Sequence, residues 1–126
     1  MSVLVDTSVW IEYFRSGKST EKLDYFIDEN IIAINDLILS ELVPSLRIRN
    51  QQKIIRLLYN IARLDLLIDW NQVTDFQFKC LKNGINGIGI PDLIIAQNAI
   101  QNDSAVYTFD GHFNLIKDIL KFQVID

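Results

Sequence analysis

Five short apolar runs of the kind that form buried β-strands alternate with longer segments of helical spacing along this sequence. The runs cover residues 3–5, 31–34, 66–68, 105–107 and 122–125. Because successive parallel strands need a long crossover connection, usually a helix, this alternation constrains the fold more than any other feature. It predicts an α/β sandwich in which helices flank a central, mainly parallel sheet.

The expected organisation is one domain over residues 1–126. The 126 residues are 49% hydrophobic, which is enough for a core, and no Pro-rich or Ser-rich linker divides them. The single cysteine, Cys80, cannot form a disulfide within the chain. The first apolar run is far shorter than the roughly 18 residues of a membrane span. We therefore expect a cytoplasmic protein without a membrane segment.

Several residues mark expected helix starts. Ser8 is placed to cap the first helix, and Asn35 is placed to cap the helix after the second strand. Asp69, with Gln72 three residues later, resembles a capping box. Pro91 suits the first turn of the helix that follows a glycine-containing loop.

Two acidic residues follow expected strands. Asp6 comes directly after residues 3–5, and Asp110 ends the stretch AVYTFD. A buried charge is unfavourable unless it is compensated. In open parallel sheets, ligands bind beyond the carboxyl ends of the strands, where the strand order reverses. Both acids are therefore expected at the default ligand site.

Two further acids lie on expected helices. Glu41 follows Leu37 and Ile38 by one turn, at the edge of an otherwise inward-facing stripe. Asp92 precedes Ile95 by three residues, so it begins a buried face. We expect both carboxylates to face inward at an end of the sheet.

Each acid also has a purely structural explanation. Asp6 can cap the next helix, and Asp92 fits the preference for acids in a first helical turn. Glu41 can reach solvent, and Asp110 with Gly111 is a common turn pair. Together, however, four acids at one sheet edge would repel strongly. Two unit charges about 4 Å apart interact by roughly 4 kcal/mol at an effective dielectric constant near 20.

A divalent cation would relieve this repulsion. Oxygen ligands without clustered His or Cys favour Mg²⁺ or Mn²⁺ over zinc. His112, the lone histidine, cannot build a zinc site by itself, and we expect it in a loop or at the surface near the site. Hard-metal carboxylate sites commonly serve phosphoryl chemistry, and this is the chemistry that the acids predict.

Four stretches resemble the acidic motifs of PIN-domain ribonucleases, and specifically of the VapC-type toxins of type II toxin–antitoxin pairs. They read VLVDTSVWIE, DLILSEL, IPDLIIAQNA and VYTFDGHF. Their order and spacing match jointly, and the resemblance covers nearly the whole chain. It implies a PIN-like three-layer sandwich with five strands in the order 3-2-1-4-5, in which the strands before Asp6 and Asp110 are neighbours.

The resemblance also implies residue roles. The catalytic and metal-binding acids would be Asp6, Glu41, Asp92 and Asp110, with Asp6 and Asp92 as the strongest metal ligands. Thr7 or Ser8 would orient Asp6 by hydrogen bonding, and Thr108 would help to hold the late loop. Many relatives carry a further acid where this chain has His112, which leaves the number of bound ions open.

The implied activity is Mg²⁺-dependent (or Mn²⁺-dependent) endonucleolytic cleavage of RNA by an activated water. The implied partners are a VapB-type antitoxin and a second copy of the chain. Some apolar residues exceed what one helix face can bury, so they are either core or interface. They are Trp10, Tyr13, Phe14, Leu57, Leu58, Tyr59 and Ile61.

A net charge of −4 argues against binding nucleic acid through overall charge, so an RNA substrate would need a local basic surface. Residues 42–64 contain no Asp or Glu. The candidate RNA-binding residues there are Arg47, Arg49, Lys53 and Arg56. The alternative is a solvated helical hairpin.

Two other functions stay open. A receiver-type phosphoacceptor domain also places acids at the ends of parallel strands, and Asp69 is the only acceptor candidate here. A PIN-like binding module with a decayed site is the second alternative. Retention of four mutually repelling acids argues against decay.

Overall fold

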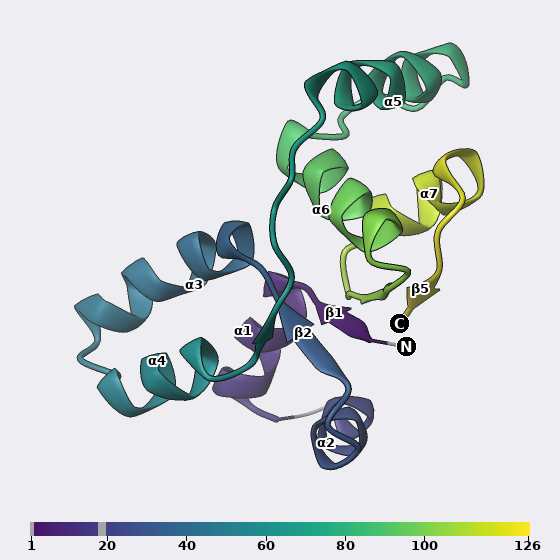
Figure 1. Ribbon diagram of the computed structural model, residues 1–126. Coiled ribbons are helices and arrows are strands. Elements are labelled where there is room, and N and C mark those ends of the chain that lie inside the picture. Colours follow the sequence, from purple (N-terminus) through teal and green to yellow (C-terminus); the bar gives the residue numbers. More distant parts are fainter. Residues whose placement is uncertain (1, 18–19) are drawn as a thin grey trace.

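The computed structural model describes residues 2–17 and 20–126, and its centre is a five-stranded sheet of order β3-β2-β1-β4-β5 (Figure 1). The strands are β1 (Val3–Val5), β2 (Ile32–Ile34), β3 (Ala62–Arg63), β4 (Ala105–Tyr107) and β5 (Val124–Ile125). All four pairings between these strands are parallel. The predicted parallel α/β fold and its strand order are confirmed.

Helices flank this sheet. They are α1 (Thr7–Arg15), α2 (Glu21–Asp28), α3 (Asp36–Ile48), α4 (Gln52–Tyr59), α5 (Trp70–Lys82), α6 (Ile90–Gln101) and α7 (Gly111–Leu120). In Figure 1, α3 and α4 lie on one side of the strands, and α5, α6 and α7 lie on the other. Within residues 2–17 and 20–126, no helix combines the length and apolar character needed to cross a membrane.

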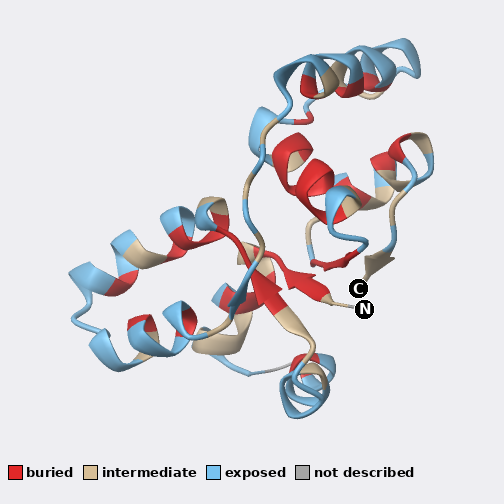
Figure 2. Cartoon of the chain, in the orientation of Figure 1, coloured by how far each residue is buried: buried red, intermediate tan, exposed pale blue. Residues whose placement is uncertain are grey.

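Buried side chains concentrate on the central strands and on α6 (Figure 2). All residues of β1 and β4 are buried, because each of these strands has a neighbour on both sides. The edge strand β3 is exposed at both residues. Residues 93–99 of α6 are all buried. The core therefore fixes β1, β4 and α6, the elements that carry or precede three of the four candidate acids.

Three of the predicted helix starts are confirmed. Asn35 Oδ1 accepts a hydrogen bond from Ile38 N at 2.9 Å, and Asp69 Oδ1 accepts one from Gln72 N at 3.2 Å. Pro91 lies in the first turn of α6. The reciprocal half of the Asp69 capping box is missing, because Gln72 Oε1 accepts a bond from α6 instead.

The prediction that Ser8 caps the first helix is wrong. Helix α1 begins at Thr7, and Asp6 occupies the N-cap position without making a side-chain capping bond. The Ser8 hydroxyl instead donates to Asp6 Oδ2 at 3.0 Å. Thus neither side chain caps the helix, and the Asp6 carboxylate makes no hydrogen bond to the backbone of α1.

The predicted third strand at residues 66–68 is also wrong. The strand next to β2 is β3, in which Ala62 pairs with Ala33 and Arg63 pairs with Ile34. Residues 64–69 form no regular element. The two strands predicted at residues 31–34 and 122–125 exist but are shorter, as β2 and β5.

Side-chain amides of α6 explain why residues 64–69 are extended without joining the sheet. Asn98 Nδ2 donates to the carbonyl of Asp65 at 2.8 Å, and Gln101 Nε2 donates to that of Leu67 at 2.9 Å. Gln97 Nε2 donates to the carbonyl of Asp69 at 3.1 Å. We call Gln97, Asn98 and Gln101 the α6 amide row. This row supplies the hydrogen bonds that a neighbouring strand would otherwise provide.

Candidate metal centre

The parallel pairing of β1 with β4 places Asp6 beside Thr108. The register pairs Val5 with Tyr107, so the next residue of each strand is adjacent. Asp6 N donates to the Tyr107 carbonyl at 2.9 Å, and Thr108 Oγ1 donates to Asp6 Oδ2 at 2.9 Å. Asp6 is 6% exposed. Its carboxylate therefore lies at the carboxyl edge of the two central strands.

The hydroxyls of Ser8 and Thr108 hold both Asp6 and the loop after β4. Ser8 Oγ donates to Asp6 Oδ2 and accepts from Phe109 N at 3.0 Å. Thr108 Oγ1 accepts from Asp110 N at 2.9 Å. Both hydroxyls donate to Asp6 Oδ2. No described residue donates a hydrogen bond to Asp6 Oδ1. The Oδ1 atom is thus available to a further partner.

Thr7 contacts Glu41 rather than Asp6. Thr7 Oγ1 donates to Glu41 Oε1 at 2.9 Å, which joins the first turn of α1 to α3. Partial burial of the Glu41 carboxylate raises its pKa, and the negative charges of Asp6 and Asp92 raise it further, against the lowering effect of the Thr7 bond. Glu41 therefore lies within electrostatic reach of two other candidate acids.

Asp92, Asp110 and His112 form the most compact part of the site. One ligand atom from each lies within 4.8 Å of the other two. His112 Nδ1 is 3.4 Å from Asp92 Oδ2 and 3.5 Å from Asp110 Oδ1. Burial raises the pKa of Asp92; the charges of Asp110 and Asp6 also raise it, whereas His112 lowers it.

His112 lies closer to the candidate acids than the sequence suggested. It is surface-exposed, as expected, but it lies in the first turn of α7 rather than in a loop. Asp110 is the N-cap residue of α7, and its Oδ1 accepts a hydrogen bond from His112 N at 2.9 Å. The signal that could have revealed this contact is the spacing of two residues from an acidic N-cap.

Asp92 and Asp110 come together with His112 in one cluster, and Asp6 and Glu41 lie within electrostatic reach of Asp92. The charge effects in the pKa values of Glu41 and Asp92 connect these two residues with Asp6 and Asp110. Carboxylate oxygens suit Mg²⁺ or Mn²⁺. A cation would also remove the repulsion between the acids. The residues present therefore fit a divalent metal, and their individual roles stay predictions.

The repulsion in this site predicts a pH dependence of stability without metal. Because the folded state raises the pKa of Asp92 and Glu41, it binds more protons than the unfolded chain just above the ordinary carboxyl pKa. The free energy of unfolding should then fall as the pH rises through that range. Asp92→Asn should flatten this fall and raise the free energy of unfolding near neutral pH by up to about 1 kcal/mol.

Urea unfolding in EDTA between about pH 4 and pH 7, where carboxyl groups of raised pKa titrate, measures this effect. The difference between parent and variant isolates Asp92 from the other titrating groups. A variant that is less stable than the parent near pH 7 would contradict the expectation.

The candidate RNA-binding cations do not share one face. Arg49 lines a cavity between α1 and α3, whereas Arg47 lies beside Val43 and Ile48. Lys53 and Arg56 lie on α4. Their contact with RNA stays a prediction.

Fold and site together define a class of protein. The molecule is an open parallel α/β protein with acidic side chains gathered where the strand order reverses, between β1 and β4. The family model described as "PIN domain" matches residues 3–119. The chain belongs to the PIN domain family.

Three solved structures share this fold over nearly the whole chain. VapBC2 from Rickettsia felis, bound to a DNA fragment from their promoter, has a TM-score of 0.78 at 20% identity and covers 99% of this chain and 98% of that chain. DNA-bound VapBC from Salmonella typhimurium has a TM-score of 0.77 at 16% identity, with 100% and 98% covered. VapBC-1 from nontypeable Haemophilus influenzae has a TM-score of 0.73 at 19% identity, also with 100% and 98% covered. No curated protein matches the sequence.

Proposed function

We propose that this chain is a Mg²⁺- or Mn²⁺-dependent endoribonuclease, the toxin of a VapBC-type toxin–antitoxin pair, acting in the cytoplasm. One observation carries the proposal: the carboxylates of Asp6, Glu41 and Asp110, from three other segments, lie within electrostatic reach of Asp92, although burial and these charges raise the pKa of Glu41 and Asp92. Membership of the PIN domain family and the likeness to VapBC structures support the same function.

In this function Asp6 and Asp92 would be the main metal ligands, with Glu41 and Asp110 beside them. A bound divalent ion would neutralise charge on the phosphate and activate a water molecule. Ser8 and Thr108 fix the Asp6 carboxylate, and Thr7 fixes Glu41. These hydroxyls orient the acids before substrate arrives, so little reorganisation is needed during the reaction.

The receiver alternative does not fit the fold. Receiver domains have the flavodoxin-like strand order 2-1-3-4-5, which differs from the order found here. Asp69, the only acceptor candidate, caps α5 through its own side chain. The decayed binding module stays as the alternative to an active enzyme.

An apolar groove of about 500 Å³ supports a protein partner. Six of the seven predicted interface residues line it: Trp10, Tyr13, Phe14, Leu57, Leu58 and Ile61. The seventh, Tyr59, instead packs its ring under the Arg63 guanidinium. We propose a VapB-type antitoxin as this partner.

We also propose a homodimer, the remaining partner implied by the resemblance. Size-exclusion chromatography at micromolar concentration should show a mass of twice the monomer. A strictly monomeric chain would contradict this part of the proposal.

The central experiment compares RNA from cells that express the parent with RNA from cells that express Asp6→Ala. New fragment ends should appear only with the parent, and sequencing them identifies the target. Thermal melting with Mn²⁺ separates the enzyme from the decayed module, because an ion that binds the native state raises its stability. Absence of both effects in the parent would reject the proposed enzyme.

A further inference from the structure

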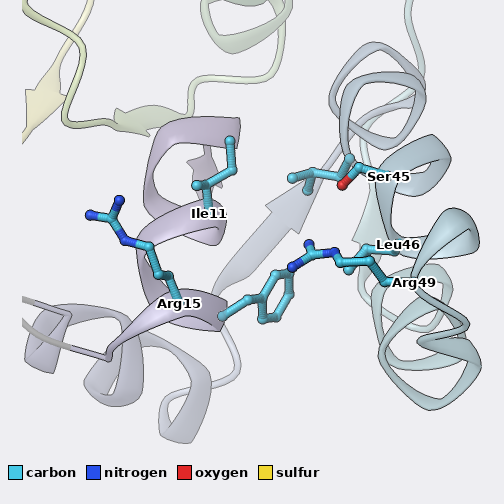
Figure 3. Close-up of a pocket in the computed structure, with 7 residues that line it drawn as sticks. Ile11, Arg15, Ser45, Leu46 and Arg49 are labelled. Carbon is cyan, nitrogen blue, oxygen red and sulfur yellow. The ribbon is translucent and has the colours of Figure 1, made fainter.

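A second cavity lies between α1 and α3, and it shares Phe14 with the apolar groove. Its volume is about 150 Å³, and Ile11, Phe14 and Leu46 form part of its apolar wall. Ser45 adds a hydroxyl, and the guanidinium of Arg49, the C-cap residue of α3, points toward α1, whereas the Arg15 guanidinium points away from the cavity (Figure 3). A cavity of about 150 Å³ is large enough for a single six-membered ring.

Two rows of side chains connect this cavity to the candidate metal centre. Thr7, Ile11 and Arg15 follow one another at intervals of four residues on α1. Glu41 and Ser45 on α3 and Arg49, its C-cap residue, have the same spacing. Residues four apart lie on the same face of a helix. The Thr7–Glu41 hydrogen bond of 2.9 Å joins the two rows at the acidic end.

The arginines lie at the other end of these rows. Eight residues of helix rise about 12 Å, a distance that a few nucleotides of a single strand can bridge. One end of the path therefore offers acids suited to a metal, and the other offers the Arg49 guanidinium beside an apolar cavity.

The two arginines differ in whether a carboxylate already neutralises their charge. Arg15 pairs with Glu12 at 2.7 Å, on the exposed side of α1. Arg49 takes part in none of the salt bridges within residues 2–17 and 20–126. The planar fork of an unpaired guanidinium matches the oxygens of a phosphate group. Arg49 is thus the stronger candidate for an anion contact.

We propose, on the basis of the proposed RNA-cleaving function, that the cavity between α1 and α3 is a subsite for single-stranded RNA. It receives one base against the apolar wall, while Arg49 contacts a neighbouring phosphate. Binding of a base on an apolar surface beside a basic group is the usual way in which proteins hold single strands. The subsite would position the strand so that a phosphodiester a few nucleotides away reaches the acids.

The test measures binding without cleavage. In an Asp92→Asn background, fluorescence anisotropy follows a labelled single-stranded RNA of about ten nucleotides. Arg49→Ala should weaken binding about 10-fold and reduce the slope of log affinity against log salt by about 0.7, the value for one phosphate contact. Ser45→Phe, which fills the cavity but keeps both arginines, should weaken binding about 5-fold.

The matched control is Lys82→Ala, which removes one positive charge from α5. It should change the affinity less than about 2-fold, because a charge outside the path acts only through the screened overall field. Equal losses in Lys82→Ala and Arg49→Ala would overturn the proposal, since charge alone would then explain them. An acidic peptide that loses binding in Arg49→Ala while RNA binding is unchanged would also overturn it, and would assign the cavity to a protein partner.

Failure of the subsite and failure of the proposed function give different results. If the parent cleaves RNA but Arg49→Ala and Ser45→Phe bind RNA as the background does, the subsite is wrong and the enzyme stands. If the parent cleaves no RNA but both substitutions weaken binding by the stated factors, the subsite stands and the proposed activity is wrong.

Discussion

Asp92→Asn is expected to slow RNA cleavage in Mg²⁺ by at least about 100-fold, the scale on which a metal site or a charge-stabilising group acts. The substitution keeps the size of the side chain but removes the negative charge that a divalent cation needs. Asp92 is suited to this role because it is close to both Asp110 and His112 at the compact end of the site. A labelled RNA incubated with parent and variant, and resolved on a denaturing gel, gives the two rates.

Asp118→Asn is the matched control for this experiment, because it removes an exposed carboxylate from the same helix that carries His112. It should cleave RNA at the rate of the parent. Thermal melting of Asp92→Asn in EDTA tests whether the variant is folded. If this folded variant cleaved RNA as fast as the parent, the assignment of the metal centre would be wrong.

Asn98→Leu is expected to lower the free energy of unfolding by about 3 kcal/mol, because it leaves the buried Asn35 amide and the part-buried Asp65 carbonyl without this partner. Asn98 is 1% exposed. Its amide donates to the Asp65 carbonyl at 2.8 Å, and its Oδ1 accepts from Asn35 Nδ2 at 3.0 Å. A loss of this size is a large fraction of the roughly 5–15 kcal/mol that stabilises a domain. Urea unfolding followed by circular dichroism measures it.

Gln101→Leu provides the comparison within the α6 amide row. Its amide makes a single bond to the Leu67 carbonyl in an exposed position, where water can replace the lost donor. The expected loss is therefore below about 1 kcal/mol. Equal losses for the two variants would show that burial of the amide is not what makes Asn98 important.

The architecture could be predicted because it depends on local patterns. The apolar runs at residues 3–5 and 105–107 became β1 and β4 with the predicted bounds, since central strands are buried on both faces and read as continuous apolar segments. Asn35 and Pro91 marked helix starts because caps act over one turn. Strand order came from the family resemblance rather than from these patterns.

The third strand could not be predicted, because the alternating pattern of residues 64–69 fits both a β-strand and an extended segment outside the sheet. Residues 64–69 alternate between more and less buried positions, as a strand would, yet they run along α6. Whether an extended segment bonds to a strand or to side-chain amides depends on which partner the fold places beside it. The amides of Gln97 and Asn98 are more than 25 residues away in sequence, so the local sequence pattern does not indicate these hydrogen bonds.

The candidate site shows the same division. The residue types and their places at strand ends and helix starts were enough to single out Asp6, Glu41, Asp92 and Asp110. Only the folded chain showed that Thr7 bonds Glu41, that Ser8 and Thr108 share one oxygen of Asp6, and that His112 approaches two acids.

The sequence by itself determined the alternation of strands and helices and the supply of acids, because both follow from side-chain chemistry at short range. Tertiary structure alone decided which oxygens are held and which stay available, and which helix faces form a path between acids and arginines. Those properties depend on distances between segments far apart in the chain, and such distances exist only once the sheet has assembled.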